Sequence, residues 1–393
     1  MTNRFRGALG ALALMALTLS SCSSKATDSN SGADLKNELK YMPADANAVG
    51  SIRLDKVLNS DGFAAFKKKN ADEAKKMSEN FKKEFGFELS NVERVTIGGV
   101  SGGSQPIVAW RLKESVKVED VKKAQESPRW NGDKGRKYKE VTIGGSTMYE
   151  PEQDQYLGSF CLVSDKLLLI GPAKVLKPAL ERGKEPEWSD GLKAGMKEAD
   201  FGAAVCMIGD VQAIAKSEKS PPQLPGIDLA AVIKATTAGV LIGKIDGSDL
   251  SIRAVAVCKD ADGAAEVKKQ ADAGLKMLAT MAEQLPKGAV PADMLALPGK
   301  VKTSTSGKLA EATVTVKQES IVEGIITMGM QMNKSVPAQG IKEDIAPSAP
   351  KEEAAIKRPP LPDTKIELDK PVDPLPVRVV PPVGVVPPKP EKK

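Results

Sequence analysis

The sequence has 393 residues and a formal net charge of +6, from 57 Lys and Arg against 51 Asp and Glu. This length suits one large domain or two smaller ones. Histidine is absent, which excludes Ser–His–Asp and Cys–His catalysis and removes the commonest metal ligand.

The first 21 residues are predicted to be a removable export signal. Arg4 and Arg6 precede an uncharged run over residues 7–19 that is dominated by Ala and Leu. A short basic region followed by an apolar run of about 7–15 residues is typical of a signal peptide, and such a run is too short to span a bilayer.

Cys22 follows this run directly, in the sequence Leu19-Ser20-Ser21-Cys22. An aliphatic residue, two small residues and a cysteine resemble the lipobox of bacterial lipoproteins. The resemblance implies that Cys22 is acylated and becomes the mature N-terminus, and that Ser23, in place of Asp, directs the protein to the outer membrane. Two or more acyl chains anchor a protein firmly, since each buried CH₂ contributes about 0.8 kcal/mol. The alternative is an ordinary secretory signal in which Cys22 is incidental.

Residues 22–34 are predicted to form a lipidated, flexible tether. They are rich in Ser, Asn, Asp and Lys, and such a composition buries too little apolar surface to fold alone. The folded part is therefore expected to begin near Leu35.

From Leu35 onward the chain alternates strand-like and helix-like segments. Strands are expected over residues 48–54, 92–100, 107–112, 141–149 and 159–170, and helices over 55–69, 118–125 and 173–182, with a Lys-rich helix that ends at Phe85. Short apolar runs between Gly- and Ser-containing turns favour the strands, and a period of about 3.6 residues favours the helices.

The second part of the chain repeats this order. Strands are expected over residues 201–208, 238–245, 250–259, 301–306 and 312–318, and helices over 210–216, 261–284 and 321–332. Residues 97–123 align with residues 242–269 after a one-residue gap, which predicts two tandem β-α-β-β-α-β-β-α repeats over 35–190 and 191–335. The predicted fold class is α+β, with an antiparallel sheet covered by helices. The repeats can form one continuous sheet or two lobes that face each other.

Residues 336–393 form a proline-rich tail. Fourteen of the 27 prolines lie between Pro337 and Pro390, and no aromatic residue occurs there. Such a segment cannot bury enough apolar area to fold, so it is predicted to be disordered or extended, as a spacer or a docking strip.

Two sets of sulfur-containing residues are candidate chemical sites. Cys161, Cys206 and Cys258 each lie in an apolar strand-like run, which favours buried cysteines that act as small hydrophobes. A disulfide between Cys206 and Cys258 is the alternative, provided that their strands are neighbours. The run Met328, Met330 and Met332 suits Cu(I) in its ligand type, but its spacing favours core packing on a helix.

The segment from Tyr41 to Ile52, a proline-led turn that leads into a strand, resembles the start of a group of uncharacterised exported bacterial proteins. The resemblance implies no activity. No catalytic, cofactor or metal residue is predicted anywhere in the chain.

The predicted function is a non-catalytic envelope lipoprotein, held at the membrane by Cys22, that acts as a binding or scaffolding module. We expect it at the outer membrane, facing the periplasm, with the proline-rich tail reaching the cell wall or an envelope protein and with no nucleic-acid partner. The first alternative is a solute- or metal-binding lipoprotein with a ligand cleft between two lobes. An envelope hydrolase that works without histidine ranks last.

Overall fold

The computed structural model describes residues 31–100, 106–127, 137–152, 158–217, 226–284 and 295–319. The predicted signal, Cys22, the helix expected over 321–332 with its three methionines, and the proline-rich tail lie outside the described residues.

Twelve strands and the helices between them make up the described part of the chain. The first half contains, in order, α2 (Ser31–Leu39), β1 (Ala48–Ile52), α3 (Leu54–Leu58), α4 (Asp61–Lys69), α5 (Ala71–Phe85), the short helix η1 (Leu89–Asn91), β2 (Val92–Gly99), β3 (Ile107–Leu112), α6 (Val118–Glu126), β4 (Tyr138–Ile143), β5 (Ser146–Pro151), β6 (Ser159–Ser164), β7 (Leu167–Gly171) and α7 (Ala173–Arg182). The second half contains α8 (Asp190–Glu198), β8 (Val205–Asp210), α9 (Val211–Ser217), α10 (Leu229–Ala235), β9 (Thr236–Asp246), β10 (Asp249–Cys258), α11 (Ala261–Gln284), α13 (Leu297–Lys300), β11 (Lys302–Ser306) and β12 (Leu309–Lys317).

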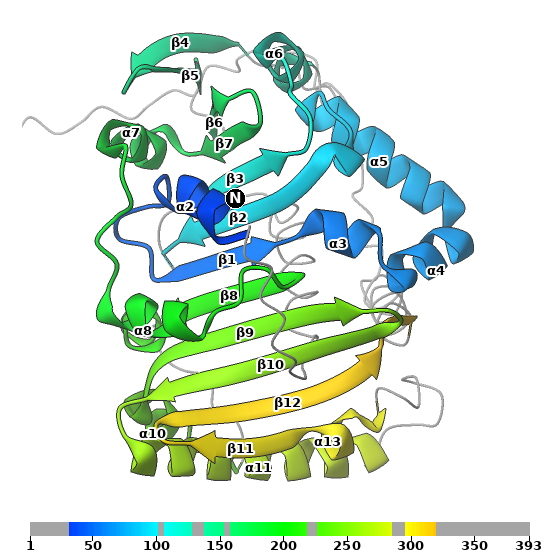
Figure 1. Ribbon diagram of the computed structural model, residues 1–393, viewed down its shortest axis with the longest axis vertical. Coiled ribbons are helices and arrows are strands. Elements are labelled where there is room, and N and C mark those ends of the chain that lie inside the picture. The colour runs from blue at the N-terminus through cyan, green and yellow to red at the C-terminus, as the bar shows by residue number, and fades with distance from the viewer. Residues whose placement is uncertain are drawn as a thin grey trace, which may run out of the picture. The chain divides into compact units, whose positions relative to one another are not determined.

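All twelve strands belong to one antiparallel sheet, so the α+β prediction is confirmed. The strand order is β11-β12-β10-β9-β8-β1-β2-β3-β7-β6-β5-β4. The two halves meet where β1 pairs with β8 in the middle of the sheet (Figure 1). The halves therefore form one continuous sheet in the described part of the chain, and not two lobes that face each other.

The two halves have the same strand order, read outward from the central pair. The first half runs β1-β2-β3-β7-β6 and the second runs β8-β9-β10-β12-β11, while β4 and β5 extend the first half alone. A helix precedes the central strand in each half, α2 before β1 and α8 before β8. The two halves therefore agree in the order of their elements. Their common origin by duplication remains a prediction.

Two expected strands are in fact hairpins. The segment 141–149 belongs to β4 and β5, which turn at Gly144 and Gly145 with φ of 57° and 78°. Two successive residues with positive φ are what a type I′ hairpin turn requires, and glycine adopts them without strain. The segment 159–170 turns between Ser164 and Leu167 to give β6 and β7. Both turns carry polar or glycine residues, Gly144-Gly145 in the first and Asp165-Lys166 in the second, so the sequence contains turn signals that the strand prediction passed over.

Helix α2 begins at Ser31, earlier than the expected start of the folded part at Leu35. Leu35 and Leu39 are buried against the sheet, and their spacing of four residues places them on one face of the helix. This apolar contact supports a helix in a segment whose composition alone predicts a tether.

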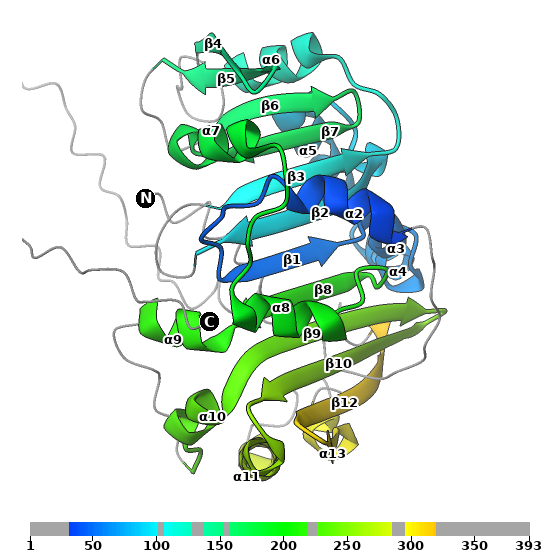
Figure 2. The same cartoon turned by 60° about the vertical axis from the view of Figure 1, so that its left-hand side comes forward.

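Helices cover both faces of the sheet. On one face α2 and α8 pack over the central strands and α7 packs over the outer strands of the first half (Figure 2), through residues such as Leu35, Leu192 and Leu176. On the opposite face of the first half, the Lys-rich α5 packs Phe81 and Phe85 on Trp110, with ring centroids 5.5 and 5.0 Å apart. The aromatic stripe of this helix therefore belongs to the core, as its spacing predicts.

The cysteines of the second half are not neighbours. Cys206 lies in β8 and Cys258 in β10, with β9 between them, and both are free and buried. Strands separated by a third strand are about 10 Å apart, whereas a disulfide needs Cα atoms within about 7 Å. The possible disulfide between them is therefore wrong.

Within the described ranges, no helix is both long and apolar enough to span a membrane.

Candidate functional site

The candidate site begins with a buried glutamate on α2. Glu38 follows Leu35 by three residues, so the two side chains share the helix face that packs on the sheet. The Glu38 side chain is consequently 0% exposed. A buried carboxylate is costly unless charged or hydrogen-bonding partners surround it, and the sheet below α2 supplies them.

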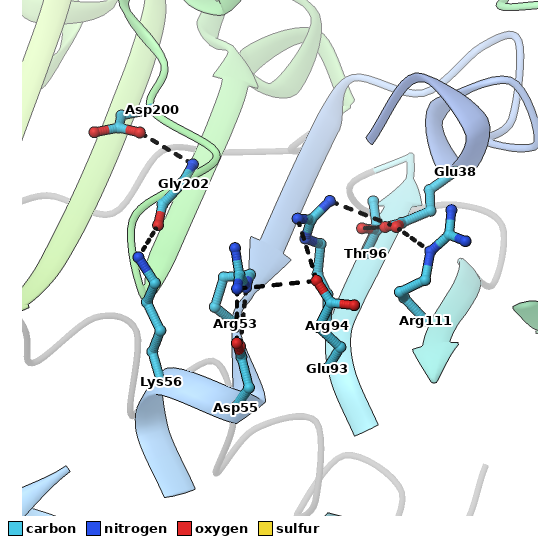
Figure 3. Close-up of polar contacts among 10 residues, drawn as sticks. All are labelled: Glu38, Arg53, Asp55, Lys56, Glu93, Arg94, Thr96, Arg111, Asp200 and Gly202. Atoms are coloured by element: carbon cyan, nitrogen blue, oxygen red, sulfur yellow. Dashed lines mark hydrogen bonds and ion pairs between the residues drawn. The ribbon is translucent and has the colours of Figure 1, made fainter. Parts of the chain in front are cut away.

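Two arginines lie opposite each other on the neighbouring strands β2 and β3. Arg94 and Arg111 are cross-strand partners, so both side chains extend from the same face of the sheet. Like charges in such a pair repel each other, which means that the pair needs an anion between or above it. Glu38 occupies that position (Figure 3).

The carboxylate of Glu38 contacts three side chains. Its Oε1 atom lies 3.5 Å from Nη1 of Arg94 and 3.2 Å from Nε of Arg111. Its Oε2 atom accepts a hydrogen bond from the hydroxyl of Thr96. Arg94 is 1% exposed and Arg111 15% exposed, so α2 is held to the sheet by an ionic cluster that water barely reaches.

Burial dominates the electrostatics of this cluster. Desolvation raises the pKa of Glu38, and the opposing effects of Arg94, the Thr96 hydrogen bond and Arg111 do not cancel it. Two guanidinium groups thus face one carboxylate that resists ionisation. Within the described part of the chain, Nε and Nη1 of Arg94 are buried without a hydrogen-bond partner.

A line of charges continues from Arg94 toward the second half of the chain (Figure 3). Glu93 lies 4.0 Å from Nη2 of Arg94 and 3.9 Å from Nη2 of Arg53. Arg53 in turn pairs with Asp55 at 2.6 Å. Burial acts to raise the pKa of Asp55, but the hydrogen bond and charge of Arg53 outweigh it and lower that pKa.

The next residues along α3 reach the second half directly. Nζ of Lys56 donates a hydrogen bond of 2.8 Å to the carbonyl oxygen of Gly202, whose own N–H donates to Asp200 at 3.0 Å. The polar network therefore crosses the junction between the two halves, next to the β1–β8 pair.

A small pocket opens beside the ionic cluster. Its volume is about 220 Å³, and it is lined by residues from the end of α2, from β3 and from the β6–β7 hairpin: Asn37, Lys40, Tyr41, Arg111, Val163, Ser164 and Leu167. Ligand pockets usually measure about 300–1,000 Å³. This pocket has room for a small group rather than for a large cofactor, and its charged lining residues are both cations.

The cysteines offer no reactive thiol in the described part of the chain. Burial raises the pKa of Cys161 and of Cys206 to about 12, and it also raises the pKa of Cys258. A thiol is nucleophilic only as the thiolate, so these three residues act as core side chains. The described ranges also contain no group of three or more His, Cys, Asp or Glu that could hold a metal ion.

The sequence analysis did not predict the ionic cluster. Cys22, the residue that the sequence predicts to be lipidated, lies outside the described residues. The signal that could have revealed the cluster is a charged residue on an apolar face. Glu38 lies between Leu35 and Leu39, and Arg94 and Arg111 interrupt apolar strands. Such residues indicate partners in the core, although the sequence does not say which residues pair.

The sequence matches no protein-family model and no curated protein. Among solved structures, three crystal forms of TP0453 are distantly similar. Form I has a TM-score of 0.38 and 10% identity, covering 74% of this chain and 96% of TP0453. Form III has a TM-score of 0.38 and 11% identity, covering 74% and 97%, and form IV has a TM-score of 0.37 and 11% identity, covering 74% and 96%.

Proposed function

We propose that this chain is a non-catalytic lipoprotein of the bacterial cell envelope that binds or scaffolds a partner. The observation that carries the proposal is the beginning of the chain, where a basic and then apolar export signal ends in Leu19-Ser20-Ser21-Cys22. Cys22 anchors the protein at the outer membrane, facing the periplasm. Residues 336–393 reach the cell wall or another envelope protein, and nucleic acid has no part in this function.

The described body supports a binding or scaffolding role. The strands of the described ranges form one continuous sheet, which favours a scaffold over two lobes that close around a solute. The buried carboxylate of Glu38 is engaged in holding α2 to the sheet. Its thiols are buried and protonated, which favours a structural role for them over a catalytic one.

The anchor is tested by metabolic labelling. Cells that express the full chain are fed a labelled fatty acid, and the protein is then isolated and fractionated. We expect label on the protein and recovery in the membrane fraction, with both lost in Cys22→Ala and both retained in the matched variant Cys161→Ala. An unlabelled protein, or a Cys22→Ala variant that is equally membrane-bound, contradicts the anchor.

The partner is tested by cross-linking in intact cells. A photo-reactive group placed in residues 336–393 is expected to capture one envelope protein or cell-wall polymer reproducibly. A chain that ends at residue 335 keeps its anchor and loses this partner. Capture of unrelated neighbours in proportion to their abundance counts against the scaffolding role.

A further inference from the structure

The two faces of the sheet are covered differently at the junction of the halves. On the face that carries α2 and α8, one apolar core runs through both halves. On the opposite face the apolar residues form separate clusters: Ile97 belongs with Phe81 of α5, and Leu241 belongs with Leu297 of α13. The central strands β1 and β8 lie between these two clusters (Figure 1).

A row of apolar residues joins the two clusters across the central strands. Ile97 of β2, Gly50 of β1, Met207 of β8 and Leu241 of β9 are successive cross-strand partners, so all four share one face of the sheet. The rows on either side also contain only apolar residues and glycine. An antiparallel sheet usually carries polar side chains on a face that meets water. The composition of this face therefore indicates that it is covered.

Met207 marks the place where the described residues leave this face open. It is 37% exposed, and the other exposed large apolar residues of the described ranges, Met77, Leu278 and Met281, lie on helices. Because β8 has a paired strand on each side, only an element that lies above the sheet can bury Met207.

The open strip has a defined length. At one end it is bounded by α9, because a Cβ atom added to Gly209 would lie 2.9 Å from Cδ1 of Ile214. At the other end, beyond Ile52, the chain enters α3 and α4. The five residues of β1 extend about 17 Å at about 3.3 Å per residue. A helix of about 11 or 12 residues has this length.

The described chain ends beside the strip. The N–H of Gly62, in the first turn of α4, donates a hydrogen bond of 2.9 Å to Oε1 of Gln318, and Nζ of Lys69 lies 3.0 Å from Oε1 of Glu319. Gln318 follows Val316 by two residues, and Val316 packs in the cluster that includes Leu241. Since alternate residues of a strand share a face, the chain leaves β12 at the α4 end of the strip and on its side of the sheet.

Residues 321–332 have the length and the pattern of the element that would cover the strip. They lie outside the described residues, and the sequence predicts a helix there. Ile321, Ile325, Met328 and Met332 recur at helical spacing and share one side, whereas Thr327 lies on the other. Twelve residues of helix are about 18 Å long, which matches the strip.

We propose that residues 321–332 dock as a helix over the central strands, with Ile325 and Met328 above Met207 and Gly50. The helix joins the clusters beside α5 and α13 into one core and covers the second face of the sheet at the junction of the halves. Glycine in a strand permits the close approach of another backbone. The inference goes beyond the proposed function and requires neither acylation of Cys22 nor a partner for the proline-rich tail.

The test cross-links the full chain, purified in mild detergent at low concentration. Met207→Cys is combined either with Ile325→Cys, on the docking side, or with the matched Thr327→Cys, on the other side of the predicted helix. Packed elements lie about 8–10 Å apart, so a bismaleimide of that reach is used, and the linked peptides are identified by mass spectrometry. The pair with Ile325→Cys is expected to give at least tenfold more cross-link within one chain.

Two outcomes of the cross-linking overturn the proposal. Equal yields from the two pairs, or no cross-link from either, mean that the segment does not dock in this orientation. A link between two chains means that a second copy covers Met207. The native thiols of the described residues are buried, so they do not compete for the reagent.

Alkylation of Met207→Cys alone gives a second measurement that needs no cysteine pair. This thiol is expected to react at least tenfold more slowly than Met281→Cys, at an exposed position of α11. Ile325→Lys is expected to abolish the protection, and Thr327→Lys to leave the rate within twofold, while Tm shows that each variant is folded. Absence of protection in the full chain overturns the proposal, and so does protection that survives Ile325→Lys, because another element then covers the strip.

Discussion

Helices α2 and α8 occupy corresponding places in the two halves, yet they are attached to the sheet differently. Helix α2 brings Glu38 over Arg94 and Arg111, and the three side chains are 0%, 1% and 15% exposed. Glu93 adds a second carboxylate 4.0 Å from Arg94. The contact is therefore buried.

Under α8 the charges are closer to water. Arg253 pairs with Glu198 and Glu311, and their side chains are 23%, 27% and 19% exposed. Lys244 of β9 pairs with Asp200 at 2.7 Å. The same strand order thus supports a sealed ionic cluster in one half and a partly solvated one in the other. Topology fixes where charges meet, and the individual side chains decide how far water reaches them.

The largest expected effect is a difference in folding stability when one acid is removed from each cluster. Glu38→Ala leaves Arg94 and Arg111 buried without their shared carboxylate, and breaking a buried ion pair in this way costs about 3–5 kcal/mol. Glu198→Ala leaves Arg253 its stronger partner, Glu311, and the loss of a partly solvated pair costs about 0–1 kcal/mol. Urea denaturation of both variants measures the difference. Equal losses would mean that the cluster under α2 is as solvated as that under α8.

The second prediction concerns how closely α8 approaches the sheet. A Cβ atom added to Gly195 would lie 2.3 Å from Cγ2 of Ile208 on β8. Gly195→Ala is therefore expected to destabilise the protein by about 1–3 kcal/mol through overpacking, despite the better helix propensity of alanine. Thermal or urea unfolding measures the loss.

The matched control is Gly299→Ala in α13, because a Cβ atom there meets nothing within 4 Å. This variant is expected to be neutral or slightly stabilising. If Gly195→Ala behaves like the control, α8 does not approach β8 closely at this glycine.

Much of the fold can be predicted from the sequence, because patterns of residues close together in the chain determine many of its helices and hairpins. Helix α11 has the predicted bounds 261–284, since Asp260 precedes it and accepts a hydrogen bond from the N–H of Gly263 at its start. The hairpin of β9 and β10 follows from two apolar runs around a tight turn at residues 247–248. Each of these elements is specified by residues close together in the chain.

The remaining features depend on residues far apart in the chain. Glu38 is separated by 58 residues from Thr96 and by 73 from Arg111, and no local pattern pairs them. The β1–β8 contact that joins the halves pairs residues that are still farther apart in the sequence, such as Ser51 and Cys206. Apolar periodicity predicts that these elements have a buried face, but it does not predict which strand covers it or which acid meets which arginine.

The third prediction concerns how folding stability depends on pH through the buried Glu38. The pKa of Glu38 is raised above its usual 4.5 by burial, so the folded state holds this proton more tightly than the unfolded state. The stability that the proton provides is complete below pH 4.5 and is lost as pH rises through the folded pKa. Glu38→Gln introduces a neutral side chain of the same shape that does not titrate, so this variant does not lose stability in this way as pH rises.

Denaturation of wild type and Glu38→Gln across pH 4–7 checks the direction in which stability changes with pH. This is roughly the range in which a carboxyl group with a raised pKa titrates. The wild type is expected to lose stability relative to the variant as pH rises. A relative gain for wild type with rising pH would mean that the arginines outweigh burial at Glu38.

The smallest expected effect is on the cysteines, and it tests the strand order on which the comparison of the two halves depends. With pKa values of about 12 for Cys161 and Cys206, native protein at neutral pH is expected to resist alkylation, while urea exposes all three described thiols. A reductant is expected to leave Tm unchanged. If mass spectrometry of non-reduced protein instead joins Cys206 to Cys258, then β9 does not separate β8 from β10. The correspondence of β10 with β3 would then be lost.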